Sequence, residues 1–255
     1  MTIPLPEAAE AVLLDFDGPV CSVFAGHPAP GVADELRALI RAGGAQLTPA
    51  IRATGDPLQV LRLAHRQHPG LVPDLDDALT RAEVLAVRTA CGTPGAAEFL
   101  DACESAGRRV VIVSNNSRSA VEAYLRDRRL LSGVDAVFGR PRHRPELMKP
   151  HPIMVEAALD HLQVRPESAV LIGDSITDVQ VARHCRVPSI GLANRPQKIS
   201  SLTRAGADLT IRSMAELDPA RRRWSMLSGW ADASRRDPNS PTTTDRETGC
   251  PPRCR

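Results

Sequence analysis

Aromatic side chains are scarce in this chain of 255 residues, which contains four Phe, two Trp and one Tyr. A surface that binds nucleic acid by stacking bases needs such rings, so the composition argues against a nucleic-acid partner. The hydrophobic core must be built mainly from Ala, Val, Leu and Ile. With 42% hydrophobic and 24% charged residues, the chain nevertheless has the composition of an ordinary globular protein.

Lysine is almost absent, since Lys149 and Lys198 are the only two among 32 basic residues. Eight of the arginines fall in residues 219–255, against three Asp and one Glu, so the rest of the chain is close to neutral despite a formal net charge of +2. That balance indicates no polyanionic partner. A lysine beside a motif is therefore a candidate for a specific role.

The sequence also predicts no segment that would direct the chain to a membrane or out of the cell. No apolar run approaches the length needed to span a bilayer. The first ten residues hold two Glu and no Lys or Arg, unlike a secretory signal. Four of the six cysteines lie singly in apolar segments and are interpreted as small buried hydrophobic residues: Cys21, Cys91, Cys103 and Cys185. These features predict a cytoplasmic protein with no membrane partner.

Four short apolar runs are the clearest candidates for strands. Each is rich in Val, Ile and Leu and apolar on both faces, as expected for central parallel strands covered by helices on both sides. Helical patterns separate the last three runs. The alternation predicts an α/β fold with a doubly wound, Rossmann-like parallel sheet. The predicted strands are residues 11–14, 110–113, 169–172 and 189–192.

The connection between the first two strands is much longer than a crossover requires. It exceeds ninety residues and contains three helical patterns but no convincing strand. We interpret it as an inserted α-helical cap domain over residues 21–92. Residues 1–20 and 93–218 would then form the core. Residues 219–255, rich in Arg, Pro and Thr, are expected to be a disordered tail.

Acidic residues follow two of the predicted strands. Asp15 and Asp17 end the first, and Asp174 and Asp178 follow the third. Turn or helix-start roles could explain each acid separately, because Asp-Gly is common in turns and Asp178 fits a first helical turn. In a parallel sheet, however, the strand ends share one edge. Asp15, Asp17 and Asp174 should therefore converge there with Ser114, and three carboxylates would crowd together. Such a cluster of hard oxygen ligands favours Mg²⁺.

Polar residues also follow the second strand, in the run Ser114-Asn115-Asn116-Ser117. Ser117 or Asn116 is expected to cap the next helix. Ser114 offers a hydroxyl, and backbone N–H groups at a helix start face an anion. Lys149 precedes a later helix and is followed directly by a proline. An isolated lysine usually lies in solvent, but an ammonium fixed beside the acids would bind a phosphate oxygen.

These motifs together resemble those of the haloacid dehalogenase-like superfamily of phosphohydrolases with a helical cap inserted after the first motif. DFDG at residues 15–18 matches the first motif, SNNS at residues 114–117 the second, Lys149 the third and GDSITD at residues 173–178 the fourth. All four occur in order. The resemblance covers about residues 11–218 and leaves the tail unexplained.

The resemblance implies roles for the four acids. Asp15 would be the nucleophile that takes up the phosphoryl group as an aspartyl-phosphate, and Asp17 would act as the general acid and base. Mg²⁺ would be held by the Asp15 carboxylate, the Asp17 backbone carbonyl and Asp174, with Asp178 in support. Phosphoryl transfer needs mainly alignment and charge neutralisation from a protein, which this set could supply.

The resemblance also implies that Ser114, Asn115 and Lys149 bind the substrate phosphate. Pro19 departs from the family pattern, in which Thr or Val is more frequent at this position. Proline removes a backbone donor and fixes φ there, so it could alter how the first loop meets the cap without disabling the site.

The sequence thus predicts a Mg²⁺-dependent phosphatase that hydrolyses a phosphomonoester of a small metabolite. Asp17 argues against dehalogenase or phosphonatase chemistry, since those branches lack an acid at this place. Two alternatives stay open: a sugar-phosphate mutase of the same fold, and a non-catalytic binding domain. A mutase cap often supplies a lysine, which residues 22–92 lack, although His27 could serve a mutase. Neither the substrate nor the oligomeric state can be predicted from the sequence.

Overall fold

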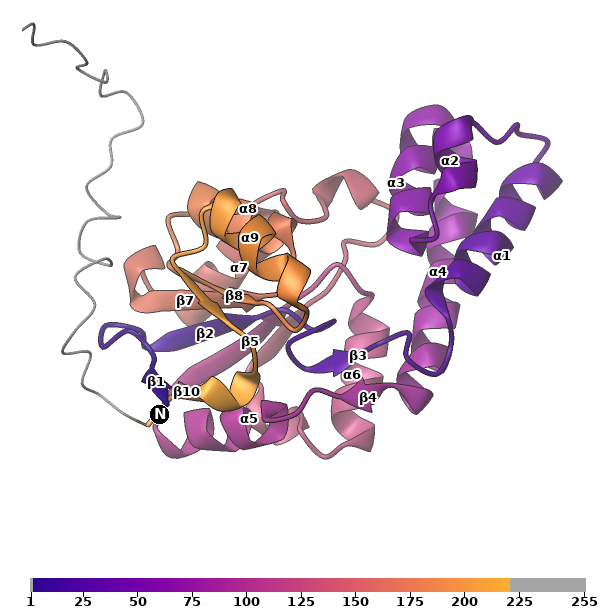
Figure 1. Cartoon of the computed structure of the whole chain (residues 1–255). Coiled ribbons are helices and arrows are strands. Elements are labelled where there is room, and N and C mark those ends of the chain that lie inside the picture. The colour runs from indigo at the N-terminus through magenta and orange to yellow at the C-terminus, as the bar shows by residue number, and fades with distance from the viewer. Residues whose placement is uncertain (1, 221–255) are drawn as a thin grey trace, which may run out of the picture.

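The computed structural model describes residues 2–220, and the part of the predicted tail over residues 221–255 lies outside the described residues. Figure 1 shows an α/β core beside a bundle of helices contributed by the segment between the first two central strands. None of the helices within residues 2–220 is both long and apolar enough to cross a membrane.

The core is a parallel sheet of six strands in the order β6-β5-β2-β7-β8-β9. The predicted doubly wound α/β fold is therefore confirmed, and the four predicted strands are β2, β5, β7 and β8. The two edge strands were not predicted, because they are only three residues long and partly exposed. The strands are β2 (Ala11–Leu14), β5 (Arg109–Val113), β6 (Ala136–Phe138), β7 (Ala169–Gly173), β8 (Ser189–Leu192) and β9 (Leu209–Ile211).

Side chains of the central strand β2 alternate between the two layers of helices, because successive strand residues point to opposite faces. Val12 and Leu14 pack with residues of α5 and α6. Ala11 and Leu13 pack with residues of α7 and α8 on the other face. The core helices are α5 (Ala96–Ser105), α6 (Arg118–Asp127), α7 (Ile153–Leu162), α8 (Ile176–His184) and α9 (Pro196–Ala205).

The strand order places the expected ligand site at β2. After β2 the chain builds β5 and β6 on one side, then returns to build β7, β8 and β9 on the other. Ligands of open α/β sheets bind outside the carboxyl ends of strands at such a switch point. A small parallel pair, β1 (Ile3–Pro4) with β10 (Leu217–Asp218), lies outside the main sheet.

The inserted segment has a hydrophobic core of its own, with Val32, Leu36 and Leu61 among its buried residues. Each of its four helices carries a proline in the first turn, where proline is well tolerated. Two antiparallel segments, β3 (Cys21–Ser22) and β4 (Cys91–Gly92), join it to the sheet. The helices are α1 (Ala29–Ala42), α2 (Pro49–Ala53), α3 (Pro57–Gln67) and α4 (Val72–Ala86).

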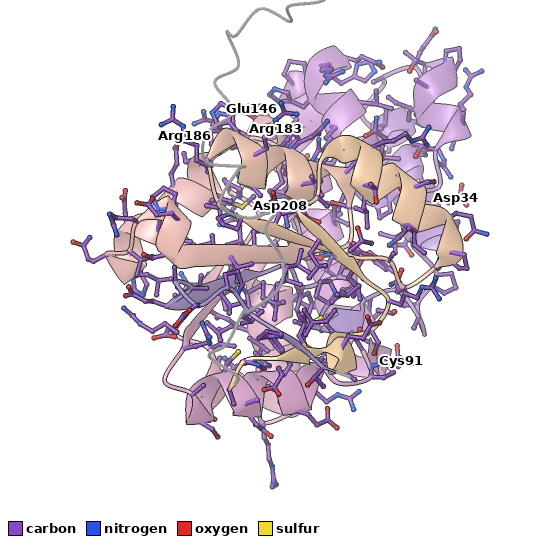
Figure 2. All side chains as sticks on the ribbon, turned by 60° about the vertical axis from the view of Figure 1, so that its left-hand side comes forward. Asp34, Cys91, Glu146, Arg183, Arg186 and Asp208 are labelled. Carbon is purple, nitrogen blue, oxygen red and sulfur yellow. The ribbon has the colours of Figure 1, made fainter. Side chains whose placement is uncertain are left out.

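One cysteine prediction is wrong. Cys21 and Cys103 are buried as expected, and Cys185 is half-buried, but Cys91 is exposed. Figure 2 shows Cys91 at the edge of the molecule. The apolar run before it belongs to the end of α4, whereas Cys91 itself lies in the two-residue strand β4, both of whose residues are exposed.

Candidate active site

The first two acids lie at the carboxyl end of β2. The backbone N–H of Phe16 donates to Asp15 Oδ1 at 2.8 Å, which orients that carboxylate. Asp17 Oδ1 accepts from the Val23 N–H at 3.0 Å. Gly18 has φ +110°, and a Cβ there would lie 2.4 Å from Asp174 Oδ2. The glycine is required both for this backbone conformation and for the close approach of the loop to Asp174.

Asp15 is joined by the acids that follow β7. Carboxylate oxygens of Asp15, Asp174 and Asp178 lie within 4.8 Å of one another. Asp178 also closes a capping box at the start of α8, since its Oδ2 accepts from the Ser175 N–H at 3.0 Å. Gly173 makes room for it, because a Cβ at Gly173 would lie 2.4 Å from the Asp178 side chain. Of the acids expected to converge at the strand ends, Asp15 and Asp174 lie in this group, and its third member is Asp178.

Lys149 lies inside this cluster and is 1% exposed. Its Nζ is 2.9 Å from Asp15 Oδ1 and 2.6 Å from Asp178 Oδ1, and it donates to the Val113 carbonyl at 2.7 Å. Burial opposes the charged form, but Asp15 and Asp178 raise the pKa of Lys149 above its ordinary value. The ammonium is therefore a fixed positive charge.

Burial raises the pKa of three carboxyl groups in the site. Desolvation, followed by the charge of Asp178, raises the pKa of Asp15 to about 7, although Lys149 opposes the shift. Desolvation also raises the pKa of Asp17 to about 6 against the hydrogen bond from Val23. The pKa of Asp174 is raised by burial despite its ion pair with Lys198. The cluster therefore needs protons or a further cation to offset its charge.

The donor set fits a hard divalent cation. Asp15, Asp174 and Asp178 offer carboxylate oxygens from β2, the end of β7 and the first turn of α8. Such oxygens are better ligands for Mg²⁺ than for soft metals, which prefer thiolates. The Asp17 carboxylate is outside this group of three and accepts a hydrogen bond from Val23. This arrangement is compatible with metal binding by the Asp17 backbone carbonyl rather than by its carboxylate.

The polar residues of the loop after β5 form hydrogen bonds within the protein. Ser114 is buried, and its Oγ accepts a hydrogen bond from the Asn116 N–H at 3.2 Å. The Asn115 side chain is bonded to the Lys149 backbone, accepting from its N–H at 2.8 Å and donating to its carbonyl at 3.4 Å. Ser117 caps α6 by accepting from the Ala120 N–H, as predicted. The Asn115 side chain therefore holds the backbone of Lys149, and its contact with the substrate phosphate stays a prediction.

Three side chains near the site were not predicted. Glu83 of α4 accepts from the Ser117 N–H at 2.9 Å, Arg62 of α3 donates to the Lys149 carbonyl, and Lys198 forms an ion pair with Asp174. Lys198 had a signal in the sequence, because it is one of only two lysines. Glu83 and Arg62 lie on amphipathic helices of the inserted segment, where a charged residue ordinarily faces solvent.

The raised pKa of Asp15 predicts a pH dependence of stability. A carboxyl group whose folded pKa exceeds its unfolded value binds more protons in the folded state, so it stabilises at low pH and loses that effect as pH rises. In protein freed of metal by a chelator, the contribution of Asp15 should fall between about pH 4 and pH 7. Thermal unfolding of the wild type and Asp15→Asn across this range measures it, because the difference between them isolates Asp15. A difference independent of pH would contradict the shift.

Comparison with known proteins gives a consistent result. A family model described as haloacid dehalogenase-like hydrolase matches residues 9–186. The phosphoglycolate phosphatase of Rhodospirillum rubrum is 28% identical over 197 residues, covering 71% of this chain and 78% of that protein. The 2-hydroxy-3-keto-5-methylthiopentenyl-1-phosphate phosphatase of Microcystis aeruginosa is 28% identical over 186 residues, covering 69% and 81%.

Solved structures share the fold. A haloacid dehalogenase family hydrolase from Deinococcus radiodurans, with bound phosphate and sodium, superposes with a TM-score of 0.54 at 25% identity, covering 82% of this chain and 93% of that one. CbbY from Rhodobacter sphaeroides, in complex with phosphate, gives a TM-score of 0.60 at 23% identity, covering 82% and 96%.

A Rossmann-like sheet with three carboxylates and a buried lysine at its switch point fits phosphoryl chemistry. Together with the similarity to phosphatases, it makes this chain a hydrolase of phosphoric monoesters. The chain belongs to the haloacid dehalogenase-like hydrolases. The resemblance drawn from the four motifs is thereby confirmed.

Proposed function

We propose that this protein is a Mg²⁺-dependent phosphatase that hydrolyses a small phosphomonoester through an aspartyl-phosphate on Asp15. The observation that carries the proposal is the buried Lys149 ammonium, 2.9 Å from Asp15 and 2.6 Å from Asp178, beside Asp174. A purely binding role does not require a lysine and three carboxylates crowded at one sheet edge with a further acid at Asp17.

The residues divide the chemistry between attack and charge compensation. The Phe16 N–H and Lys149 both contact Asp15 Oδ1, so the carboxylate is oriented before substrate arrives. Lys149 would also contact the transferred phosphoryl group and offset its charge. Mg²⁺, when held by Asp15, Asp174, Asp178 and the Asp17 carbonyl, would neutralise phosphoryl oxygens.

Asp17 is suited to protonate the leaving oxygen. With a pKa of about 6, its protonated fraction near neutrality is far larger than that of an ordinary carboxyl group. The same group can afterwards take a proton from the water that attacks the aspartyl-phosphate. This exchange of roles is ordinary general acid–base catalysis.

Replacing Asp17 by Asn should slow turnover by about 10² to 10⁴, the usual contribution of a general acid–base group. The amide keeps an oxygen that can accept from the Val23 N–H, so the loop should keep its conformation. Steady-state phosphate release measures the effect. Activated esters such as p-nitrophenyl phosphate should lose less, because their leaving group needs little protonation. Near-normal turnover of an unactivated substrate with metal bound would contradict this role.

The substrate class follows from the relatives. Phosphatases of phosphoglycolate and of a sugar-like phosphate match more than two thirds of this chain, and both substrates are small phosphomonoesters. The direct test is a panel of phosphorylated metabolites that includes 2-phosphoglycolate, assayed for released phosphate with Asp15→Asn as the blank. Failure to release phosphate from any of them would contradict the proposal.

A sugar-phosphate mutase is the second candidate, and the position of His27 disfavours it. His27 lines a surface cavity between α1 and α4, together with Glu35 and Arg81. Within residues 2–220 no hydrogen bond joins His27 to the loop that bears Asp17. We expect steady phosphate release from a sugar monophosphate with no isomer formed, measured by parallel phosphate assay and ³¹P NMR. Isomerisation faster than phosphate release would favour the mutase.

A further inference from the structure

Arg140, in the loop after β6, forms a buried ion network with the cap helix α4. Its side chain is 1% exposed, and those of Asp76 and Glu83 are 2% and 0% exposed. Nε donates to Asp76 Oδ1 at 2.7 Å, and Nη1 donates to Glu83 Oε1 at 2.8 Å. Nη2 donates to Glu83 Oε2 at 3.2 Å and to Thr80 Oγ1 at 3.3 Å. One guanidinium thus binds three residues of one helix.

Groups of the core also donate hydrogen bonds to the two carboxylates of this network, Glu83 and Asp76. Glu83 Oε2 accepts from the Ser117 N–H at 2.9 Å, at the start of α6, and Glu83 Oε1 accepts from the Asn116 amide at 3.2 Å. The helix dipole favours a carboxylate at this place. Asp76 Oδ2 accepts from the His143 N–H at 2.6 Å. Since removing one partner would leave a buried charge uncompensated, the arrangement strongly favours one geometry.

The network continues to the phosphate-binding lysine. Arg140 Nη1 donates to the Asn115 carbonyl at 2.8 Å. The Asn115 side chain in turn binds the Lys149 N–H at 2.8 Å and the Lys149 carbonyl at 3.4 Å. The Arg140 guanidinium is thus connected to the backbone of Lys149 through a single residue, Asn115.

We propose that Arg140 is a positioning residue, held by Asp76 and Glu83 of the cap, that fixes Asn115 and through it the Lys149 ammonium. The inference rests on the proposed function, in which Lys149 binds the substrate phosphate. Attachment of the cap to the core does not by itself require Arg140 to contact the Asn115 carbonyl. Arg142 also pairs with α4, through Asp77 at 3.2 Å, but this pair is largely exposed.

The test is binding of inorganic phosphate, measured by isothermal titration calorimetry in the presence of Mg²⁺, together with kcat and KM. The variants are Arg140→Lys, Asn115→Ala and the double variant, with Arg142→Lys as the matched control. Arg140→Lys keeps the buried charge but loses the fork that reaches both α4 and Asn115. Asp76→Asn is a milder second variant that weakens the hold on Arg140 from the cap side. Thermal unfolding of each variant identifies temperatures at which all are folded.

We expect Arg140→Lys to weaken phosphate binding by about tenfold. It should lower kcat/KM by at least as much, since a misplacement of about 1 Å can cost up to about 10²-fold in rate. Asp76→Asn should have a smaller effect in the same direction, and Arg142→Lys none. The double variant should bind about as weakly as Asn115→Ala alone, because that change already breaks the link to Lys149.

Two results would overturn the inference. If Arg140→Lys lowers only the melting temperature while phosphate affinity and kcat/KM stay normal, Arg140 merely anchors the cap. If the losses in Arg140→Lys and Asn115→Ala multiply in the double variant, Arg140 does not act through Asn115. Failure of the proposed function is distinguishable, because the wild type would then release no phosphate from any substrate, whereas phosphate affinity is measured without turnover. A wild type that binds no phosphate would overturn the positioning role.

Discussion

Asp15→Asn should abolish phosphate release while leaving the protein folded. The amide cannot form the acyl-phosphate that divides hydrolysis into two steps. Its oxygen can still accept from the Phe16 N–H, and Lys149 keeps its ion pair with Asp178 at 2.6 Å. Because burial raises the pKa of Asp15 to about 7, removing this carboxylate should not destabilise the metal-free protein above that pH.

The measurement is single-turnover and steady-state phosphate release, with circular dichroism to confirm the fold. Asp34→Asn is the matched control, since Asp34 on α1 has a side chain that is 74% exposed and lies at the edge of the cap in Figure 2. It should keep wild-type turnover. Near-normal hydrolysis by Asp15→Asn with metal bound would show that Asp15 is not the nucleophile.

Removing the metal should have an equally large effect. Exhaustive chelation is expected to stop turnover, because the attack brings an anionic substrate to a cluster of three carboxylates that Lys149 only partly offsets. Added Mg²⁺ should restore activity. It should also raise the melting temperature, since a ligand at about 100 times its Kd stabilises by about 2.7 kcal/mol.

The size of this stabilisation should depend on pH. Metal and proton compete for the carboxylates, and the pKa values of Asp15 and Asp174 are both raised. The shift in melting temperature caused by Mg²⁺ should therefore shrink as pH falls from about 8 to about 6. Asp174→Asn should reduce it strongly at every pH. Asp208→Asn should leave the Mg²⁺-induced shift intact. Asp208 is remote from the acid cluster and accepts a hydrogen bond from the Ser189 N–H. Activity that survives chelation would contradict a metal site.

The network around Arg140 joins the cap helix α4 to the loop after β5. Glu83 occupies the start of α6, where the sequence suggested that backbone N–H groups would face a ligand anion. An anion is indeed bound there, but it is a carboxylate of the protein itself. In the proposed function, the group that contacts the substrate phosphate is Lys149.

The sequence by itself determined the four central strands and the place of the acid cluster at their carboxyl ends. Runs such as Ala11–Leu14 are apolar on both faces, and this pattern is typical of strands buried between two layers of helices. Once those strands are parallel, residues that follow them must meet at one edge. Asp15 and Asp174 could therefore be brought together without coordinates, whereas the third acid of the cluster is Asp178 and not the Asp17 of the prediction. The rarity of lysine drew attention to Lys149.

Only the tertiary structure decided how the cap meets this site. Glu83 and Arg140 are 57 residues apart, and neither lies in a local pattern that marks it as buried. A charged residue on an amphipathic helix is ordinarily solvated, and its burial becomes favourable only when packing supplies a partner of opposite charge. The same holds for Asn115, whose partner Lys149 is 34 residues away. Strand ends converge because of backbone topology, which periodicity encodes, whereas paired charges depend on the docking of two separate surfaces.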